Sequence, residues 1–249
     1  MPLKLPKIIG HRGAAAYAPE NTLEGLHTAA DMGVEWVEFD VKITKDDIPI
    51  LFHDDTLERT TNGGDRAIAD LTYDEIKQYE AGSWFGESFA GIRIPTLAEA
   101  IEVLIEHDLG LNLEIKPCPG REKQTAEVAL DVLSHYWDNH DALLISSFSH
   151  VSMETAMDMA PDWHRGFLLP EEWPENWQEL AEYLHVSTLN VNGNLVTYED
   201  VRALMELELP ILAYTINDPD RAELLRSWGV DGFFTDMPDV LQDAIQTIH

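Results

Sequence analysis

The chain of 249 residues is short of cysteine, of basic residues and of long apolar runs. Cys118 is its only cysteine, which excludes an internal disulfide and a zinc site built from several cysteines. Sixteen lysines and arginines stand against 46 acidic residues, and the formal net charge of −30 argues against nucleic acid or an anionic membrane as a partner. No apolar stretch approaches the roughly 20 residues that cross a bilayer, and residues 1–6 lack the apolar core of a secretion signal. We therefore expect a cytoplasmic protein without stable membrane association, whose oligomeric state the sequence leaves unknown.

Short runs with strand character alternate with amphipathic helical stretches along almost the whole chain. We predict strands at Lys7–Gly10, Glu35–Lys42, Leu111–Lys116, Leu143–Ser147, Arg165–Leu169, Ser187–Val191, Ile211–Thr215 and Gly232–Thr235. Eight strands, most of them followed by a helix, favour an α/β fold of the (β/α)8 TIM-barrel type, which often has about this length. An open doubly wound sheet is the alternative, because the alternation alone separates the two folds poorly. We expect a single catalytic barrel domain over residues 1–249.

Two of the expected helices begin with a recognisable cap. Asn21 with Glu24, and Thr96 with Glu99, have the spacing of a capping box. In that motif the first side chain accepts a hydrogen bond from the backbone three residues on, and the second side chain reaches back. We therefore expect helices to begin directly after Asn21 and directly after Thr96.

One unit departs from the alternation of strands and helices. After the second strand, Thr44–Asp47 have the polar composition of a turn and the run that follows is again apolar, which predicts a hairpin folded back on that strand. If residue 43 pairs with residue 50, then Asp40 faces His53, because the paired numbers of a hairpin keep a constant sum. Residues 55–95 then form a small insertion between the hairpin and the Thr96 helix.

Charged side chains occupy inward positions of two expected strands. Side chains two apart on a strand share a face, so Glu38 points with Asp40, and Glu114 points with Lys116. Charges there are costly unless they are paired or bound to a metal. Three carboxylates at strand ends make an oxygen-rich site suited to one divalent cation, Mg²⁺ or Ca²⁺, with Mn²⁺ as a further candidate. Taken pair by pair, the same charges also fit an exposed strand edge or a structural ion pair.

Histidines and cations are expected at the same end of the barrel. His11 and Arg12 follow the first strand between two glycines, and the hairpin carries His53 towards Asp40. Two imidazoles can exchange acid and base roles, while Arg12 and Lys116 offset the charge of a phosphate. The sequence therefore predicts a site that cleaves phosphodiesters with a bound cation.

The motifs at these positions resemble those of the glycerophosphodiester phosphodiesterase family. They are HRG from His11, PENT from Pro19, EFD from Glu38, FHD from Phe52, IPTL from Ile94, EIKP from Glu114 and, at the end, VDGFFTD from Val230. The resemblance implies a barrel with an insertion, and metal-dependent hydrolysis of a small-molecule glycerophosphodiester to sn-glycerol 3-phosphate and an alcohol. It implies these roles: His11 and His53 as catalytic acid and base, Arg12 and Lys116 as substrate-binding cations, and Glu38, Asp40 and Glu114 as metal ligands.

Tyr214 departs from the family pattern, because it stands where the family usually has tryptophan. We expect it to bind the glycerol or the leaving alcohol. The sequence leaves open which of His11 and His53 is the base, and whether the nucleophile is water or the glycerol 2-hydroxyl.

Two other functions are compatible with the same residues. A phospholipase D-like enzyme or a cyclising phosphodiesterase would act on lysophospholipids, and the acidic composition without an apolar anchor counts against it. A catalytically silent protein would only bind glycerophosphodiesters, but binding does not require two proton-transfer groups.

Overall fold

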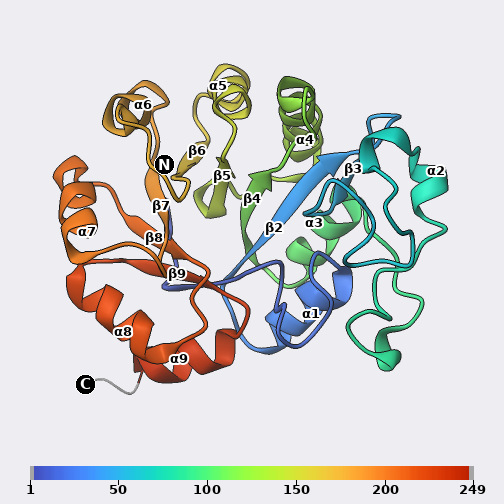
Figure 1. Cartoon of the computed structure of the whole chain (residues 1–249), viewed down its shortest axis with the longest axis horizontal. Helices are drawn as coiled ribbons and strands as arrows, with labels where there is room; N and C mark the ends of the chain where they lie inside the picture. Colours follow the sequence, from blue (N-terminus) through green and yellow to red (C-terminus); the bar gives the residue numbers. More distant parts are fainter. Residues whose placement is uncertain (1–2, 247–249) are drawn as a thin grey trace.

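The computed structural model describes residues 3–246 and contains the predicted (β/α)8 barrel (Figure 1). Eight parallel strands run in the order β1-β9-β8-β7-β6-β5-β4-β2, and the pairing of β1 with β2 closes the ring. This closure excludes the open doubly wound sheet. The barrel strands are β1 (Ile8–Gly10), β2 (Trp36–Ile43), β4 (Gly110–Ile115), β5 (Leu143–Ser147), β6 (His164–Leu168), β7 (Thr188–Asn192), β8 (Ile211–Tyr214) and β9 (Gly232–Thr235).

Helices pack around the outside of the barrel (Figure 1). They are α1 (Leu23–Asp31), α3 (Leu97–Glu106), α4 (Glu122–Tyr136), α5 (His150–Met159), α6 (Trp177–Tyr183), α7 (Tyr198–Leu204), α8 (Pro219–Trp228) and α9 (Pro238–Gln246). Outward strand residues such as Val37, Phe39 and Val41 are buried in one apolar cluster with α1, α3 and α4. Within residues 3–246, no helix combines the length and the apolar character that a membrane span requires.

The two predicted helix caps have different outcomes. Thr96 and Glu99 form the expected capping box at the start of α3. At the start of α1 the cap is Thr22, whose side chain accepts from the backbone N–H of Gly25, so the prediction of Asn21 as the cap is wrong. Asn21 instead takes a left-handed backbone conformation (φ 56°), which asparagine tolerates better than most residues.

The interior of the barrel changes from apolar to polar along the strands. Near the amino-terminal ends, one buried cluster contains Ile9, Trp36, Leu144, Leu212 and Phe234. Side chains two positions further along share the same face, and they are His11, Glu38, Ser146, Tyr214 and Asp236. The polar layer thus lies at the carboxyl end of the strands, where such barrels carry their active sites, and the apolar layer packs next to it on the amino-terminal side.

The predicted hairpin is present. β3 (Pro49–Leu51) runs antiparallel to the end of β2, but the register differs by one residue from the prediction. Phe52 N, in place of His53, bonds to the backbone oxygen of Asp40, so the direct pairing of Asp40 with His53 is wrong. The turn is one residue tighter because Asp47 takes the left-handed conformation (φ 63°).

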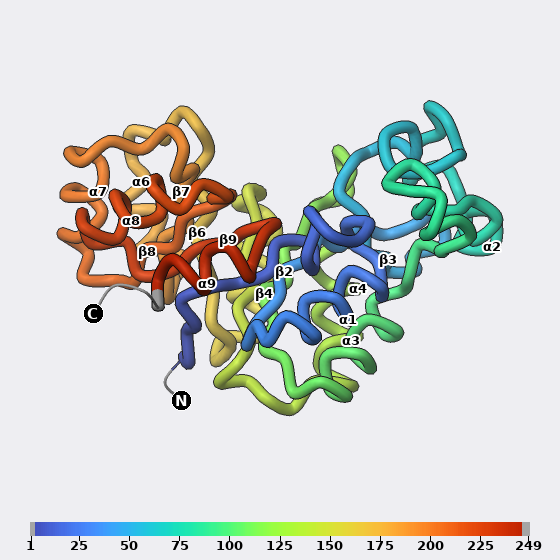
Figure 2. The backbone as a smooth tube through the Cα atoms, turned by 90° about the horizontal axis from the view of Figure 1, so that it is seen from below, coloured from blue at the N-terminus to red at the C-terminus, as the bar shows by residue number. Residues whose placement is uncertain are grey.

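The segment between β3 and α3 forms a small lobe beside the barrel. It contains the short helix α2 (Tyr73–Ile76) and the 3-10 turns Ile68–Asp70 and Glu87–Phe89. Figure 2 shows this lobe at the opposite end of the molecule from α7. Its buried apolar residues pack in one cluster with Ile50 of β3 and with Cys118, which follows β4. Those of the lobe itself are Phe52, Leu57, Ile68, Ile76, Ala81 and Ile94. An ion pair between Lys42 Nζ, on β2, and Asp55 Oδ1 (2.7 Å) also ties the lobe to the barrel.

Candidate active site

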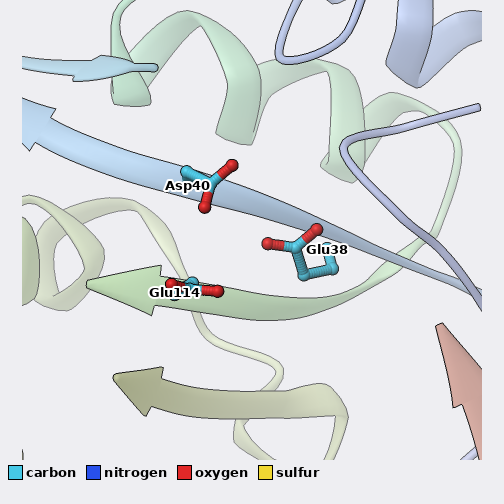
Figure 3. A group of neighbouring side chains, drawn as sticks. All are labelled: Glu38, Asp40 and Glu114. Atoms are coloured by element: carbon cyan, nitrogen blue, oxygen red, sulfur yellow. The ribbon is translucent and has the colours of Figure 1, made fainter. Parts of the chain in front are cut away.

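Three carboxylates from neighbouring strands meet at the carboxyl end of the barrel. Glu38 and Asp40 come from β2 and Glu114 comes from β4, and Figure 3 shows the three side chains gathered over these two strands. One ligand atom of each residue lies within 4.8 Å of those of the other two. Glu38 and Asp40 are buried, and Glu38 Oε1 has no hydrogen-bond partner among the described residues. Such a set of hard oxygen atoms, with one acceptor free, fits Mg²⁺, Ca²⁺ or Mn²⁺.

The three carboxylates differ in how their charge is stabilised. Burial, together with the charges of Asp40 and Glu114, raises the pKa of Glu38 well above its usual range. Burial and the charge of Asp40 likewise raise the pKa of Glu114. For Asp40 the effect of burial is outweighed by Arg12 and Lys116, which hold the pKa of that carboxyl below its usual range. Two cations thus leave part of the negative charge uncompensated, which favours the binding of a further cation.

The two predicted phosphate-binding cations lie against this carboxylate cluster. Arg12 Nε is 3.1 Å from Asp40 Oδ2, and the backbone N–H of Arg12 donates to Glu38 Oε2 at 2.9 Å. Lys116 Nζ is 2.9 Å from Glu114 Oε1 and 3.7 Å from Asp40 Oδ1. Burial opposes the charge of Lys116, but the two carboxylates raise its pKa, so it stays a cation.

Each predicted catalytic histidine has a carboxylate at its Nδ1 atom. His11 Nδ1 is 2.7 Å from Asp236 Oδ1, and His53 Nδ1 is 2.6 Å from Asp54 Oδ1. With the proton on Nδ1, the lone pair of Nε2 is free to accept a proton. His11 Nε2 lies 3.9 Å from Glu38 Oε2, at the edge of the carboxylate cluster. Burial lowers the pKa of His53, against the opposite effect of Asp40.

The carboxylates behind the histidines are themselves held in place. Asn217 Nδ2 donates to Asp236 Oδ2 at 2.7 Å. Arg59 donates to both oxygens of Asp54, from Nε at 2.7 Å and from NH2 at 2.9 Å. The hydrogen bonds from Arg59 lower the pKa of Asp54 to about 2. Both carboxylates are therefore fixed as anions facing an imidazole.

The sequence analysis missed the roles of several of these residues. Asn21 supports a predicted metal ligand, because its Nδ2 donates to Asp40 Oδ2 (2.9 Å) and its Oδ1 accepts from Asp40 N (3.1 Å). Glu20 Oε1 accepts from Arg12 NH1 at 2.9 Å. The quoted PENT motif thus supplies two supports of the site and, at its threonine, a helix cap. Asp236 ends the quoted VDGFFTD motif, but its role follows from the closed barrel, which sets the end of the last strand beside that of the first.

Tyr214 lies at the carboxyl end of β8, and its hydroxyl group is already engaged. Tyr214 Oη donates to the backbone oxygen of Leu169 at 2.6 Å, and the ring packs edge-on against Phe148 with centroids 5.8 Å apart. Burial raises the pKa of Tyr214, so it stays a neutral phenol. Towards a substrate the phenol therefore offers its ring and an acceptor lone pair.

A barrel of this kind, with two imidazoles and two cations beside a carboxylate cluster, defines a hydrolase that cleaves phosphodiesters. The sequence model of the glycerophosphoryl diester phosphodiesterase family matches residues 11–240. The chain belongs to this family and is an enzyme with glycerophosphodiester phosphodiesterase activity. The predicted family, fold and enzyme class are confirmed.

Relatives named as phosphodiesterases match nearly the whole length of the chain. A glycerophosphodiester phosphodiesterase of Caldanaerobacter subterraneus is 33% identical over 247 residues, which are 96% of this chain and 97% of the relative. One of Bacillus altitudinis is 31% identical over 240 residues, which are 94% of this chain and 96% of the relative. A phosphodiesterase of Oleispira antarctica, solved in complex with the product sn-glycerol 3-phosphate, is 41% identical with a TM-score of 0.93, and the match covers 97% of both chains.

Proposed function

We propose that the enzyme converts glycerophosphodiesters to sn-glycerol 3-phosphate and an alcohol, with His11 and His53 as the acid–base pair. The observation that carries the proposal is the pair of imidazoles beside the carboxylate cluster, each with a carboxylate at Nδ1. The product bound to the relative from Oleispira antarctica supports the same product here. We also propose that residues 1–249 form one catalytic domain and that 55–95 are an insertion within it.

Glu38, Asp40 and Glu114 are the proposed ligands of one divalent cation. When bound, the cation supplies positive charge that polarises a phosphoryl oxygen and offsets the charge of the phosphate. Arg12 and Lys116 bind further phosphate oxygens and stabilise the negative charge that develops in the transition state. The dense negative charge of the chain, −30, makes such local cations necessary for an anionic substrate.

The two histidines move the protons. One accepts the proton of the nucleophile at Nε2, and the other donates a proton from Nε2 to the alcohol oxygen as its bond to phosphorus breaks. Asp54 and Asp236 stabilise the imidazolium that is present at each stage. The nucleophile is water in direct hydrolysis, or the glycerol 2-hydroxyl in a route through a cyclic phosphate that water then opens. Phosphorus NMR of the reaction separates the routes, because only the second forms a cyclic glycerol phosphate.

Tyr214 is the proposed boundary of the site on the side of the leaving alcohol. A pocket of about 290 Å³ lies next to it, because its lining includes Asn192, which pairs with Tyr214 across β7 and β8, and Pro170, which follows the Leu169 oxygen. The indole of Trp173 also lines this pocket and provides an apolar wall. We propose that the alcohol part of the substrate extends into it.

Turnover of glycerophosphocholine before and after metal removal tests the proposed function. EDTA should abolish the release of glycerol 3-phosphate, and Mg²⁺, Ca²⁺ or Mn²⁺ should restore it, because the uncompensated carboxylates require a cation. Glu114→Gln should greatly reduce the metal-stimulated rate. The matched control is Glu127→Gln, which removes a half-exposed carboxylate paired with Lys123 on α4 and should keep the wild-type rate. Full activity in demetallated enzyme would contradict the proposal.

A further inference from the structure

Arg59 lies in the insertion and bonds two carboxylates from different parts of the chain. Its Nε and NH2 atoms donate to Asp54 at 2.7 and 2.9 Å. Its NH1 and NH2 atoms donate to Glu20 at 2.8 and 2.7 Å. The guanidinium is planar and its donors are rigidly placed, so four such bonds fix the two carboxylates relative to each other.

Each of these carboxylates bonds a residue of the proposed active site with the same oxygen that faces Arg59. Asp54 Oδ1 accepts from Arg59 NH2 and lies 2.6 Å from His53 Nδ1. Glu20 Oε1 accepts from Arg59 NH2 and from Arg12 NH1 (2.9 Å). A continuous chain of hydrogen bonds and ion pairs therefore runs from the imidazole of His53 through Arg59 to the guanidinium of Arg12.

The attachment of the insertion does not depend on Arg59. The insertion has its own apolar core, and the pair between Lys42 and Asp55 ties it to β2 independently. The side chain of Arg59 is 44% exposed, whereas that of Glu20 is 11% exposed, so Arg59 is the solvent-facing central member of this chain of contacts. Because the apolar core and the Lys42–Asp55 pair remain when Arg59 is removed, the effects on orientation and on folding can be separated by experiment.

We propose that Arg59 is a positioning residue, which acts through Asp54 on His53 and through Glu20 on Arg12. Without it, the carboxylate of Asp54 can rotate away from the Nδ1 atom of His53. Glu20 then also loses one of its two guanidinium partners and keeps only Arg12, which is a proposed phosphate-binding residue. The proposal rests on the proposed function, which gives His53 and Arg12 their parts in the reaction.

Kinetics of Arg59 variants provide the first test. Arg59→Ala should lower kcat for glycerophosphocholine by about 10–100-fold, the usual scale for residues that orient others, with little change in KM. Arg59→Lys should recover only part of the rate, because an ammonium cannot bond both carboxylates in the same fork geometry. The control is Arg66→Ala in the same insertion, since Arg66 bonds the Gly63 oxygen and stacks over a tyrosine ring, and it should keep the wild-type kcat.

A double-mutant cycle distinguishes positioning from a general structural role. In the Asp54→Asn background, Arg59→Ala should lower kcat by a smaller factor than it does in the wild type, because only the path through Glu20 to Arg12 remains to be broken. An equal cost in both backgrounds would overturn the path through Asp54. A fall in activity that matches a large fall in melting temperature would mean that Arg59 only supports the fold.

Histidine NMR gives a readout that needs neither metal nor turnover. In ¹⁵N-labelled, metal-free protein, Arg59→Ala should shift or broaden the Nδ1 proton signal of His53 while that of His11, held by Asp236, stays unchanged. Equal changes at both histidines, or none at His53 together with wild-type kcat, would overturn the inference. If the wild type itself proved inactive, the proposed function would fail, and the NMR comparison would still decide whether Arg59 orients His53.

Discussion

The two histidines reach the same geometry by different routes. His11 meets Asp236, which lies 225 positions away in the sequence, at 2.7 Å. His53 meets the very next residue, Asp54, at 2.6 Å. Asp236 accepts a further hydrogen bond from the neutral amide of Asn217, whereas Asp54 accepts from the cationic guanidinium of Arg59.

The difference shows that the barrel holds one histidine in place and that the insertion helps to hold the other. The His11 side depends on backbone pairing, because β9 lies beside β1 and Asn217 also accepts from the backbone N–H of Asp236. The His53 side depends on ion pairs at the surface of the insertion. Backbone hydrogen bonds between paired strands are insensitive to pH and salt, whereas exposed ion pairs are sensitive to both. We expect the two sides to be equal in chemistry and unequal in robustness.

The largest expected effect tests the chemical equality of the two sides. His11→Ala and His53→Ala should each lower kcat by about 10²–10⁴, because each removes a group that transfers a proton. Substrate affinity should change much less, since the cations and the carboxylate cluster remain. Steady-state kinetics with glycerophosphocholine measure both. A variant with near-wild-type kcat would show that its histidine is neither acid nor base.

A smaller effect is expected when the supporting carboxylates are removed. Asp236→Asn and Asp54→Asn should each lower kcat by about 10–100-fold, because the imidazolium loses its stabilising anion. Each change should lower kcat only slightly when the histidine bonded to that carboxylate is already alanine. It should lower kcat by its full factor when the other histidine is alanine instead. Costs that simply add on the same side would contradict the pairing of histidine and carboxylate.

The smallest effect concerns stability in acid and tests the ion pair on the His53 side. The pKa of Asp54 is about 2 in the folded protein, below the roughly 3.9 of a free aspartate. Because the folded value is the lower one, the stability that Asp54 contributes is fully present above about pH 4 and is lost as the pH falls towards 2. Urea unfolding should therefore show a gap between wild type and Asp54→Asn that is constant from pH 7 to 5 and narrows by pH 3. If the difference in the free energy of unfolding were as large at pH 3 as at pH 7, the ion pair of Asp54 would be contradicted.

Local patterns in the sequence predicted most of the barrel and the charged residues of the site. Strand alternation predicted that Glu38 and Asp40 share a face, and the capping-box spacing predicted that a helix begins after Thr96. Both signals are local, because each lies within a few residues. Asn21 was assigned wrongly since an asparagine fits a helix cap equally well, and only the folded barrel brings Asp40 beside it. The register of the hairpin was one residue off because the left-handed residue in the turn has no strong signal in the sequence.

The supports of the site were harder to predict than the site itself. Asp54 follows His53 directly, so adjacency in the sequence offered a signal for that pair. Arg59 gave none, because its two carboxylate partners become neighbours only when the insertion packs against the loop after β1. Asp236 required knowledge of barrel closure. Contacts between distant segments depend on topology, which residue patterns reveal only after the fold is known.

The place of β9 as the last barrel strand has a consequence for biosynthesis. Ribosomes extend the chain from its amino end, and a domain generally folds as a unit once its segments have emerged. Glu20, Asp54 and Arg59 all emerge within the first quarter of the chain. His11 waits for Asp236, after nearly all of the barrel has been translated. A nascent chain stalled before that residue lacks both the carboxylate partner of His11 and the strand that closes the ring, so we expect a competent hydrolase only after the final strand has been translated.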